Sequence, residues 1–403
     1  MTEAIVVFQR MLGQLGEAPS VELAKTLSQL GQCYRDSGQP DLAERQQRES
    51  LRVLAGLEVT DETKSIYGNA LTILADILRK QGRFPEARQA YEEGLVIYRA
   101  LGHLRGQGIS LNQLGTLAML EGNLKEASQR HGAALALFRQ LGEPRSEAVA
   151  WHQLGIVFEK MEQLVEAERC HRVAARIREE AGLIGGADGA ITSWNQLALI
   201  SGKTGKSDAA ESWYWKAIEA CRKFKFDTLA WGVLSNLSQL LASQPGRLGE
   251  ARELAEEALA IKRTLDPGGE EIWQIYSILA GIADRDSRPA EAREYWRLAR
   301  EAKRNRAENR NELRQHASLI AAAVMAAQEE RHRVDLEESF PQLEQNGWTA
   351  LVAAIRRVLV GERNEEELCD GLDLEDSMIV IAILRALEDP STLDDLLGDS
   401  EPA

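Results

Sequence analysis

The stretch Gly202-Lys-Thr-Gly-Lys-Ser207 has the residue types that bind phosphate, because glycines are followed by lysine and serine. A phosphate-binding loop needs the pattern GxxxxGK[ST], with a glycine five residues before the second glycine and a strand before the loop. Counting back from Gly205 gives Ile200, and no strand pattern precedes the stretch. The sequence therefore predicts a turn between two helices here and no nucleotide site.

Two histidines, His131 and His171, lie 40 residues apart, and Cys170 adjoins the second. A zinc site needs three or four ligands, so a structural position that recurs in a repeat is the simpler interpretation. No cysteine has the local signature of a catalytic nucleophile, and the acidic run 365–367 is typical of a helix N-terminus. We therefore predict no catalytic residue, no metal and no cofactor, and a protein that is not an enzyme.

A third set of polar residues precedes a leucine that recurs about every 40 residues. The amides immediately before that leucine are Gln29, Gln113, Gln153, Gln196 and Asn236, and one residue earlier stand Asn112, His152 and Asn195. Carboxamides both donate and accept hydrogen bonds, which suits the backbone of an extended peptide. The alternative is that these amides only make hydrogen bonds within the fold. Basic residues follow about one helical turn later, and they predict a preference for acidic ligands: Arg35, Arg79, Lys80, Lys160 and Lys203.

A sequence repeat sets the positions of these amides. The unit Leu27-Ser-Gln-Leu-Gly31 recurs so that its second leucine falls at Leu30, Leu74, Leu114, Leu154, Leu197, Leu237 and Leu279. About 13 residues later comes an alanine, at Ala43, Ala87, Ala127, Ala167, Ala210, Ala251 and Ala292. The apolar spacing is that of one helix face, and turn signals such as 81–83 separate two helices. Each unit is therefore a helical hairpin, and hairpins bury their faces by stacking into a solenoid.

The fourth unit, with Trp151, Leu154, Gly155, Phe158 and Ala167, resembles the tetratricopeptide repeat. The step near 40 residues is similar to the long-repeat subclass of kinesin light chains, in which asparagines at the ladder position hold an extended peptide. The resemblance covers residues 1–300. It implies an all-α, right-handed α-solenoid of about seven and a half hairpins, with a protein or peptide as ligand.

The two ends of the solenoid differ from the repeated units. Residues 3–16 match the second helix of a half unit, so we expect the face of Ile5, Phe8 and Leu12 to contact another protein or another copy of the chain. We assign 301–340 to a long capping helix over 308–334 and a linker that ends at Phe340-Pro341. We assign 341–403 to a small acidic helical module, with helices over 348–360, 365–372 and 375–387.

Charge is concentrated in this C-terminal part. The chain carries −15, and residues 335–403 account for −14 of it, with 18 acidic and four basic residues. This balance argues against general nucleic-acid binding. The most basic stretch is 297–314, so we expect the acidic tail to fold back on it or to occupy the groove. No apolar run is long enough to span a membrane, no signal peptide precedes the repeats, and the four cysteines are scattered, which predicts a cytoplasmic location.

The tail has a second resemblance, carried by Gly347–Arg357 and Gly371–Ser377. These stretches look like the tails of bacterial repeat proteins associated with signalling ATPases and caspase-like proteases. We therefore expect a protein-binding scaffold or regulatory subunit in a bacterial signalling or defence assembly, with a protease or ATPase among its partners. The alternatives are a regulator that inhibits a partner enzyme until a ligand releases it, and a chaperone-like adaptor for client C-termini.

Overall fold

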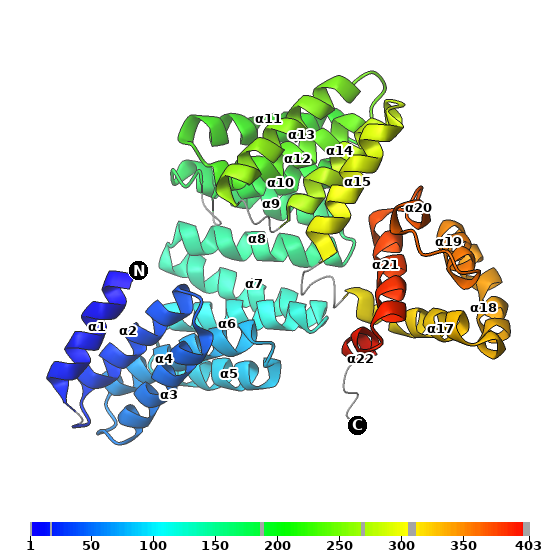
Figure 1. Cartoon of the computed structure of the whole chain (residues 1–403). Coiled ribbons are helices and arrows are strands. Elements are labelled where there is room, and N and C mark those ends of the chain that lie inside the picture. Colours follow the sequence, from blue (N-terminus) through cyan, green and yellow to red (C-terminus); the bar gives the residue numbers. More distant parts are fainter. Residues whose placement is uncertain (1, 17, 186–188, 267–270, 305–311, 398–403) are drawn as a thin grey trace. The chain divides into compact units, whose positions relative to one another are not determined.

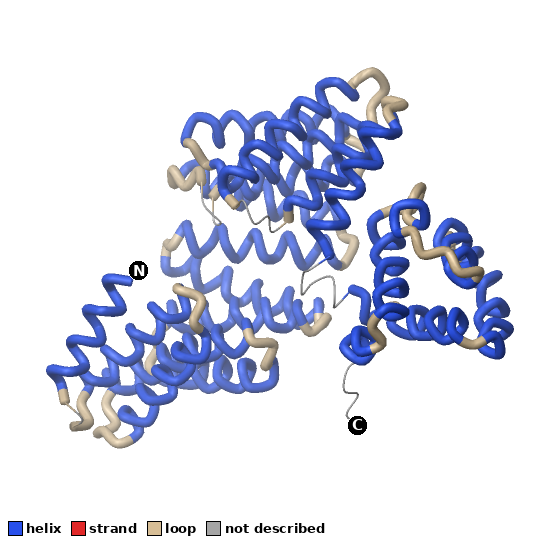
Figure 2. Tube along the Cα trace, in the orientation of Figure 1, coloured by secondary structure: helices blue, strands red, loops and turns tan. Residues whose placement is uncertain are grey.

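The computed structural model describes residues 2–16, 18–185, 189–266, 271–304 and 312–397. The described elements are helices joined by turns and loops, and these ranges contain no strand (Figure 2). The prediction of an all-α solenoid of paired helices is confirmed. The chain divides into two compact units, residues 1–220 and 221–403, which are described one at a time. No helix in the described ranges has both the length and the apolar composition needed to cross a bilayer.

Unit 1 starts with a single helix, α1 (Thr2–Leu15), which packs on the first of a series of hairpins. These hairpins are α2 (Val21–Asp36) with α3 (Pro40–Ala55), α4 (Asp61–Lys80) with α5 (Phe84–Ala100), α6 (Leu104–Leu120) with α7 (Leu124–Leu141), α8 (Pro144–Lys160) with α9 (Leu164–Glu180), and α10 (Ala190–Lys203) with α11 (Ser207–Phe224) (Figure 1). Consecutive hairpins also contact each other, through α3 and α4, α5 and α6, α7 and α8, and α9 and α10.

The repeated apolar residues form the contact within each hairpin. All seven repeat leucines are buried, with at most 8% of their surface exposed, and all seven repeat alanines are at most 1% exposed. The small residue after the leucine accepts a side chain from the partner helix. A Cβ atom added to Gly115 would lie 2.8 Å from the ring of His131, and one added to Gly31 would lie 2.6 Å from the amide of Gln47. The glycines therefore permit the close approach that the repeat predicts.

A left-handed residue ends the first helix of most units, eight residues after the repeat leucine. Glycine fills this position at Gly38, Gly82, Gly122 and Gly205, where φ is 74°, 79°, 79° and 73°. Glu162 and Ser287 occupy it in two other units, with φ of 61° and 57°. Gly205 belongs to the stretch 202–207, which forms the turn between α10 and α11, as predicted.

Unit 2 contains two hairpins and a bundle. The hairpins are α12 (Asp227–Ala242) with α13 (Leu248–Leu265), and α14 (Ile272–Arg285) with α15 (Pro289–Arg304). The bundle comprises α17 (Ala317–Gln328), a 3-10 turn (Glu330–His332), α18 (Arg333–Gln345), α19 (Thr349–Leu359), α20 (Glu365–Leu368), α21 (Leu374–Glu388) and α22 (Ser391–Leu397). These helices share one core, in which Ile320, Phe340, Ile355 and Ile383 have no exposed surface.

This core corrects the boundaries assigned to the C-terminal part. The expected long helix over 308–334 is interrupted by a turn at His316 and by the 3-10 turn, and its first residues lie outside the described ranges. Pro341 lies inside α18 and does not mark a boundary. Although proline removes one helical hydrogen bond, the adjoining Phe340 is fully buried and holds α18 in the core. Residues from Leu313 onward therefore belong with 341–397. The three helices expected beyond Pro341 correspond to α19, α20 and α21.

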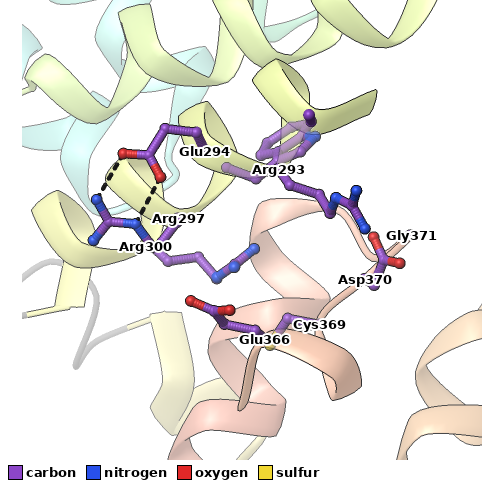
Figure 3. Close-up of a pocket in the computed structure, with 10 residues that line it drawn as sticks. Arg293, Glu294, Arg297, Arg300, Glu366, Cys369, Asp370 and Gly371 are labelled. Atoms are coloured by element: carbon purple, nitrogen blue, oxygen red, sulfur yellow. Dashed lines mark hydrogen bonds and ion pairs between the residues drawn. The ribbon is translucent and has the colours of Figure 1, made fainter. Parts of the chain in front are cut away.

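Part of the acidic segment lies against the basic helix α15. Arg304 of α15 forms an ion pair with Glu365 at the start of α20. Arginines of α15 and acidic residues of α20 and the following loop also line opposite sides of one hollow (Figure 3). The expected attraction between these segments thus corresponds to a contact within unit 2, while Arg306 and Arg310 of the basic stretch lie outside the described residues.

Candidate functional site

The first helices of the hairpins in unit 1 contact one another in series. Contacts join α2 with α4, α4 with α6, and α6 with α8, in addition to the contacts within each hairpin. First helices that approach one another in this way lie on the inner side of a stack of hairpins. A hollow of about 280 Å³ opens between α2 and α4, lined by Ser28, Gln29, Gln32, Ser65 and Asn69 among others. The first amide of the ladder, Gln29, therefore lies in a hollow of mixed lining, to which Lys25, Ile66 and Tyr98 also contribute.

Four of the predicted amides in unit 1 are at least partly exposed: Gln29, Gln113, Gln153 and Gln196. Gln29 is exposed and the other three are half-buried. None of their side chains makes a hydrogen bond with another residue in the described ranges. They follow one another on α2, α6, α8 and α10, so unused donors and acceptors recur along the first helices.

The other ladder residues serve the fold. The Nδ1 atom of His131 lies 2.8 Å from Oδ1 of Asn112, and because an amide oxygen only accepts, the imidazole donates. His152 is buried, and its ring meets that of His171 edge-on at 5.1 Å. Asn195 and Asn236 also have interaction partners, and Asn236 belongs to unit 2. For Asn112 and His152 the groove assignment is therefore corrected, because their side chains face a neighbouring helix.

Burial keeps two of the histidines uncharged. It lowers the pKa of His131 to about 4. It also lowers the pKa of His152 to about 3, with smaller contributions from the charges of His171 and Arg178. On the far side of the ring pair, Nε2 of His171 lies 2.9 Å from a carboxylate oxygen of Glu159. These contacts give the repeated histidines a structural role, and the described residues contain no group of three or more ligands placed to hold a metal.

The predicted basic residues divide in a similar way. Lys80 and Lys160 are exposed at the ends of α4 and α8. Nζ of Lys203 is 4.0 Å from a carboxylate oxygen of Glu159. Arg79 lies beside Tyr91, whose hydroxyl donates to Asp76, and the positive charge of Arg79 opposes the rise in the Tyr91 pKa caused mainly by burial. Within the described ranges, neither Lys80 nor Lys160 forms an ion pair at contact distance.

The predicted end face is half-buried against the chain's own first hairpins. Ile5, Phe8 and Leu12 of α1 pack against a buried cluster that includes Leu30, Tyr34 and Ile73. The exposed apolar side chains of α1 are instead Val6 and Val7, at 48% and 53%. The residues named for an external contact therefore serve the packing of α1 on the first hairpin, because the apolar stripe of α1 turns toward α2.

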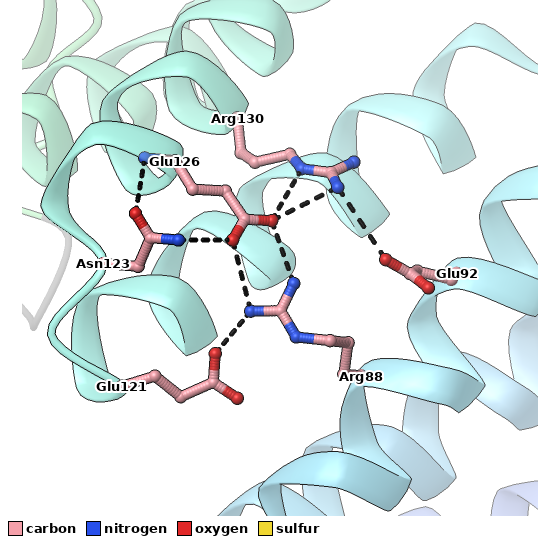
Figure 4. Close-up of polar contacts among 6 residues, drawn as sticks. All are labelled: Arg88, Glu92, Glu121, Asn123, Glu126 and Arg130. Atoms are coloured by element: carbon pink, nitrogen blue, oxygen red, sulfur yellow. Dashed lines mark hydrogen bonds and ion pairs between the residues drawn. The ribbon is translucent and has the colours of Figure 1, made fainter.

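Charged clamps hold successive second helices in position. The guanidinium of Arg88 on α5 forms two ion pairs (Figure 4). One is with Glu121, which follows α6, and the other is with Glu126 on α7, at 2.9 Å. Arg130 of α7 contacts Glu126 at 3.2 Å and extends to Glu92 of α5 at 3.7 Å. The side chains of Arg88, Glu126 and Arg130 are half-buried. A surface ion pair contributes about 0–1 kcal/mol, so the network adds little to stability compared with the buried leucines and alanines.

Of the residues that line the hollow between α2 and α4, only Gln29 was predicted as a ligand. The polar residues that were missed are Lys25, Ser28, Gln32, Ser65, Asn69 and His103. Gln32 lies three residues after Gln29, on the same helix face, and this spacing could have identified it. Asn69 lies five residues before its repeat leucine, a position that is not an amide in the other units of unit 1. The repeat alone therefore gave no signal for Asn69.

Sequence models of the tetratricopeptide repeat match residues 22–100 and 106–180, 191–224, and 232–268. Together these matches span more than half of the chain, and it belongs to the tetratricopeptide repeat family. No curated protein sequence is significantly similar to it.

Several solved structures have a similar fold. A Signal Transduction ATPase with Numerous Domains (STAND) protein with a tetratricopeptide repeat sensor, from Pyrococcus horikoshii, has a TM-score of 0.58 and 15% identity over 72% of this chain, which spans 43% of that protein. The apo form of RapI has a TM-score of 0.54 and 12% identity, covering 70% of this chain and 97% of its own. A Rap protein complexed with Competence and Sporulation Factor has a TM-score of 0.50 and 18% identity, with coverage of 75% and 80%. At these identities the similarity shows the fold.

Proposed function

We propose that the chain is a scaffold or regulatory subunit that binds an extended segment of a partner protein along the first helices of unit 1. The observation that carries the proposal is the set of four amides without partners in the described ranges, Gln29, Gln113, Gln153 and Gln196, which recur on successive first helices. Each amide can donate to and accept from a peptide backbone whatever the peptide's side chains are. The groove is therefore expected to select peptides mainly by their extended backbone conformation, and less by their sequence.

The exposed Lys80 and Lys160 favour a segment with acidic residues. The repeat step near 40 residues supports the kinesin-light-chain-like subclass, in which peptides bind at this position. The likeness in fold to a STAND protein's repeat sensor and to Rap proteins supports a place in bacterial signalling or defence. A partner of the protease or ATPase class fits this proposal.

The test is capture of partners from lysate with the full chain, compared with a Gln153→Ala/Gln196→Ala double variant and identified by mass spectrometry. Loss of two peptide hydrogen bonds is expected to weaken binding by about ten- to a hundredfold. A matched control is Gln239→Ala, which removes an exposed glutamine outside the ladder. Equal capture by the double variant and the native chain would contradict a groove built on these amides.

A further inference from the structure

The hollow between α15 and α20 in unit 2 has walls of opposite charge. It has a volume of about 250 Å³, and its lining includes Arg293 and Arg300 on α15 and Glu366 and Asp370 on the opposite side (Figure 3). None of these four side chains makes a hydrogen bond or ion-pair contact with another residue in the described ranges. The third arginine, Arg297, differs because it pairs with Glu294 at 2.7 Å and with Glu301 at 3.2 Å.

Arg300 is the most unusual of the four. Only 6% of its surface is exposed, and its Nε atom is buried without a hydrogen-bond partner in the described part of the chain. A buried charge without a counter-ion is costly, and an arginine in this situation is suited to bind a carboxylate through two of its N–H groups. Cys369 lines the same wall as Glu366, and burial raises the pKa of its thiol to about 11, so it offers no negative charge to Arg300.

An apolar surface continues from the charged walls. The adjoining hollow, of about 570 Å³, shares Arg293, Trp296, Asp370 and Gly371 with the first. It adds the apolar Pro289 and Leu372, and the carboxylates of Asp284 and Asp373 at its edge. The indole of Trp296 is held in place because its Nε1 donates to Asp284 at 3.0 Å. A ligand bound between the charged walls would thus have a fixed aromatic face and two apolar side chains beside it.

We propose that this hollow binds a free α-amino acid with an apolar side chain. Its carboxylate binds Arg300, its ammonium group binds Glu366 and Asp370, and its side chain packs against Trp296. Two unpaired cations face two unpaired carboxylates, so a ligand with both charges leaves the site neutral, whereas a simple anion or cation does not. The site lies in unit 2 and uses none of the ladder amides, so the experiment below can fail without contradicting the proposed groove in unit 1.

The experiment is isothermal titration of the full chain with L-phenylalanine and L-leucine. Each free amino acid is expected to bind saturably. N-acetyl-L-phenylalanine, which lacks the ammonium group, and L-phenylalaninamide, which lacks the carboxylate, are expected to bind at least about tenfold more weakly, since each loses a charge-assisted contact. Binding of either derivative as tightly as L-phenylalanine overturns the proposal, and so does the absence of saturable binding by both free amino acids.

Two variants test which residues bind the carboxylate and the ammonium group of the ligand. Arg300→Met and Asp370→Asn are each expected to weaken L-phenylalanine binding by at least about tenfold. Arg331→Met, an exposed arginine elsewhere in unit 2, is expected to bind as the native chain does. Asp370 is exposed, so its variant tests the site even if Arg300→Met fails to fold. Unchanged binding by Asp370→Asn overturns the assignment. A double-mutant cycle with Arg300→Met and Glu366→Gln, measured on the ligand-free chain, tests whether these two side chains pair with each other. Strong non-additivity would show that they do, and would also overturn the assignment.

Discussion

Gly155 lies directly beneath the imidazole of His171. A Cβ atom added at residue 155 would be 2.5 Å from the Cε1 and Nε2 atoms of the ring, which is closer than packed atoms approach. The ring cannot move away freely, because Nε2 of His171 is held 2.9 Å from Glu159 and the ring also packs on His152. This pair fixes how closely α8 and α9 approach each other.

Gly155→Ala is expected to lower the free energy of unfolding by about 1–3 kcal/mol, because the new methyl group forces the ring out of its packed position. Urea denaturation followed by circular dichroism measures the change. The control is Gly132→Ala, since Gly132 lies inside α7 with nothing within 4 Å of an added Cβ. Alanine there is expected to stabilise the chain by about 0.5–1 kcal/mol. Similar effects at both positions would contradict the close approach at Gly155.

Asn112 and Gln113 are neighbours with different roles, and alanine substitutions separate them. Asn112→Ala leaves the buried His131 without its hydrogen-bond partner, so a loss of about 1–3 kcal/mol in the free energy of unfolding is expected. Gln113→Ala removes a half-buried amide with no partner in the described ranges, and is expected to change stability by no more than about 0.5 kcal/mol. Thermal and urea unfolding of both variants test this. A larger loss in the free energy of unfolding for Gln113→Ala would show that Gln113 stabilises the fold, which would contradict its assignment to the groove.

The buried histidines make stability depend on pH. The pKa of His131 is about 4 and that of His152 about 3 in the folded chain, against an ordinary value of 6.5. Below pH 6.5 these two histidines therefore bind more protons in the unfolded chain than in the folded one, and their contribution to the free energy of unfolding falls as the pH is lowered toward 4. Each histidine contributes a slope of up to about 1.4 kcal/mol per pH unit. The stabilisation is fully present above pH 6.5.

Urea denaturation at about pH 5 and pH 7.5 measures this slope. His131→Gln is expected to reduce it, since one of the two groups no longer titrates. Asp376 opposes this slope between about pH 7.5 and pH 5, because burial raises its pKa to about 6. Its contribution is the same in the variant and in the native chain, so the difference between their slopes reports His131. Ion-paired carboxylates lose their contribution at lower pH. Arg88 lowers the pKa of Glu126, so the contribution of Glu126 is lost only as the pH falls below the ordinary carboxylate value of 4.5. An unchanged slope in the variant would mean that His131 is protonated in the folded chain.

Glu162 has a φ of 61°, in the turn position that glycine occupies in four other units. A left-handed conformation costs a residue with a side chain about 1–2 kcal/mol, and glycine avoids this cost. Glycine also gives the unfolded chain more conformational freedom, which cancels part of the gain in stability. Glu162→Gly is therefore expected to raise the free energy of unfolding by about 0.5–1 kcal/mol. The reverse change, Gly122→Ala at the matching position with φ of 79°, is expected to lower it. Both are measured by thermal unfolding, and destabilisation by Glu162→Gly would contradict the interpretation.

The repeat predicted the core of the hairpins residue by residue. All seven leucines and all seven alanines lie where the spacing places them, because one face of a 3.6-residue helix must be buried. The ladder was less predictable. Successive residues on a helix point about 100° apart, so Asn112 turns toward α7 while Gln113 does not, and the sequence does not state which of two adjacent polar residues faces a partner helix.

The C-terminal part contains no sequence repeat, so a boundary predicted from a single residue there could not be checked against equivalent positions in other units. Pro341 predicted a boundary by its missing N–H group, yet the burial of Phe340 outweighs that loss. In the same way, Ile5, Phe8 and Leu12 predicted an apolar face, but the amphipathic pattern of α1 gave no indication that α2 covers it. Both errors concern long-range packing, which a pattern of a few residues does not encode.

The charged clamps that link successive hairpins of unit 1 join residues about one repeat apart in the sequence. Glu44 binds Arg83, Arg88 binds Glu126, and Glu168 binds Lys206, over separations of 39, 38 and 38 residues. The contacts between first helices likewise join each hairpin to the next one along the chain. Each hairpin therefore interacts mainly with its two neighbours. The stability of unit 1 is then a sum of terms for the single hairpins and for the interfaces between neighbours, as in a one-dimensional Ising model. Backbone amides would exchange with deuterium fastest at the ends of unit 1 and slowest near α6 and α7, with the unit opening inward from its ends.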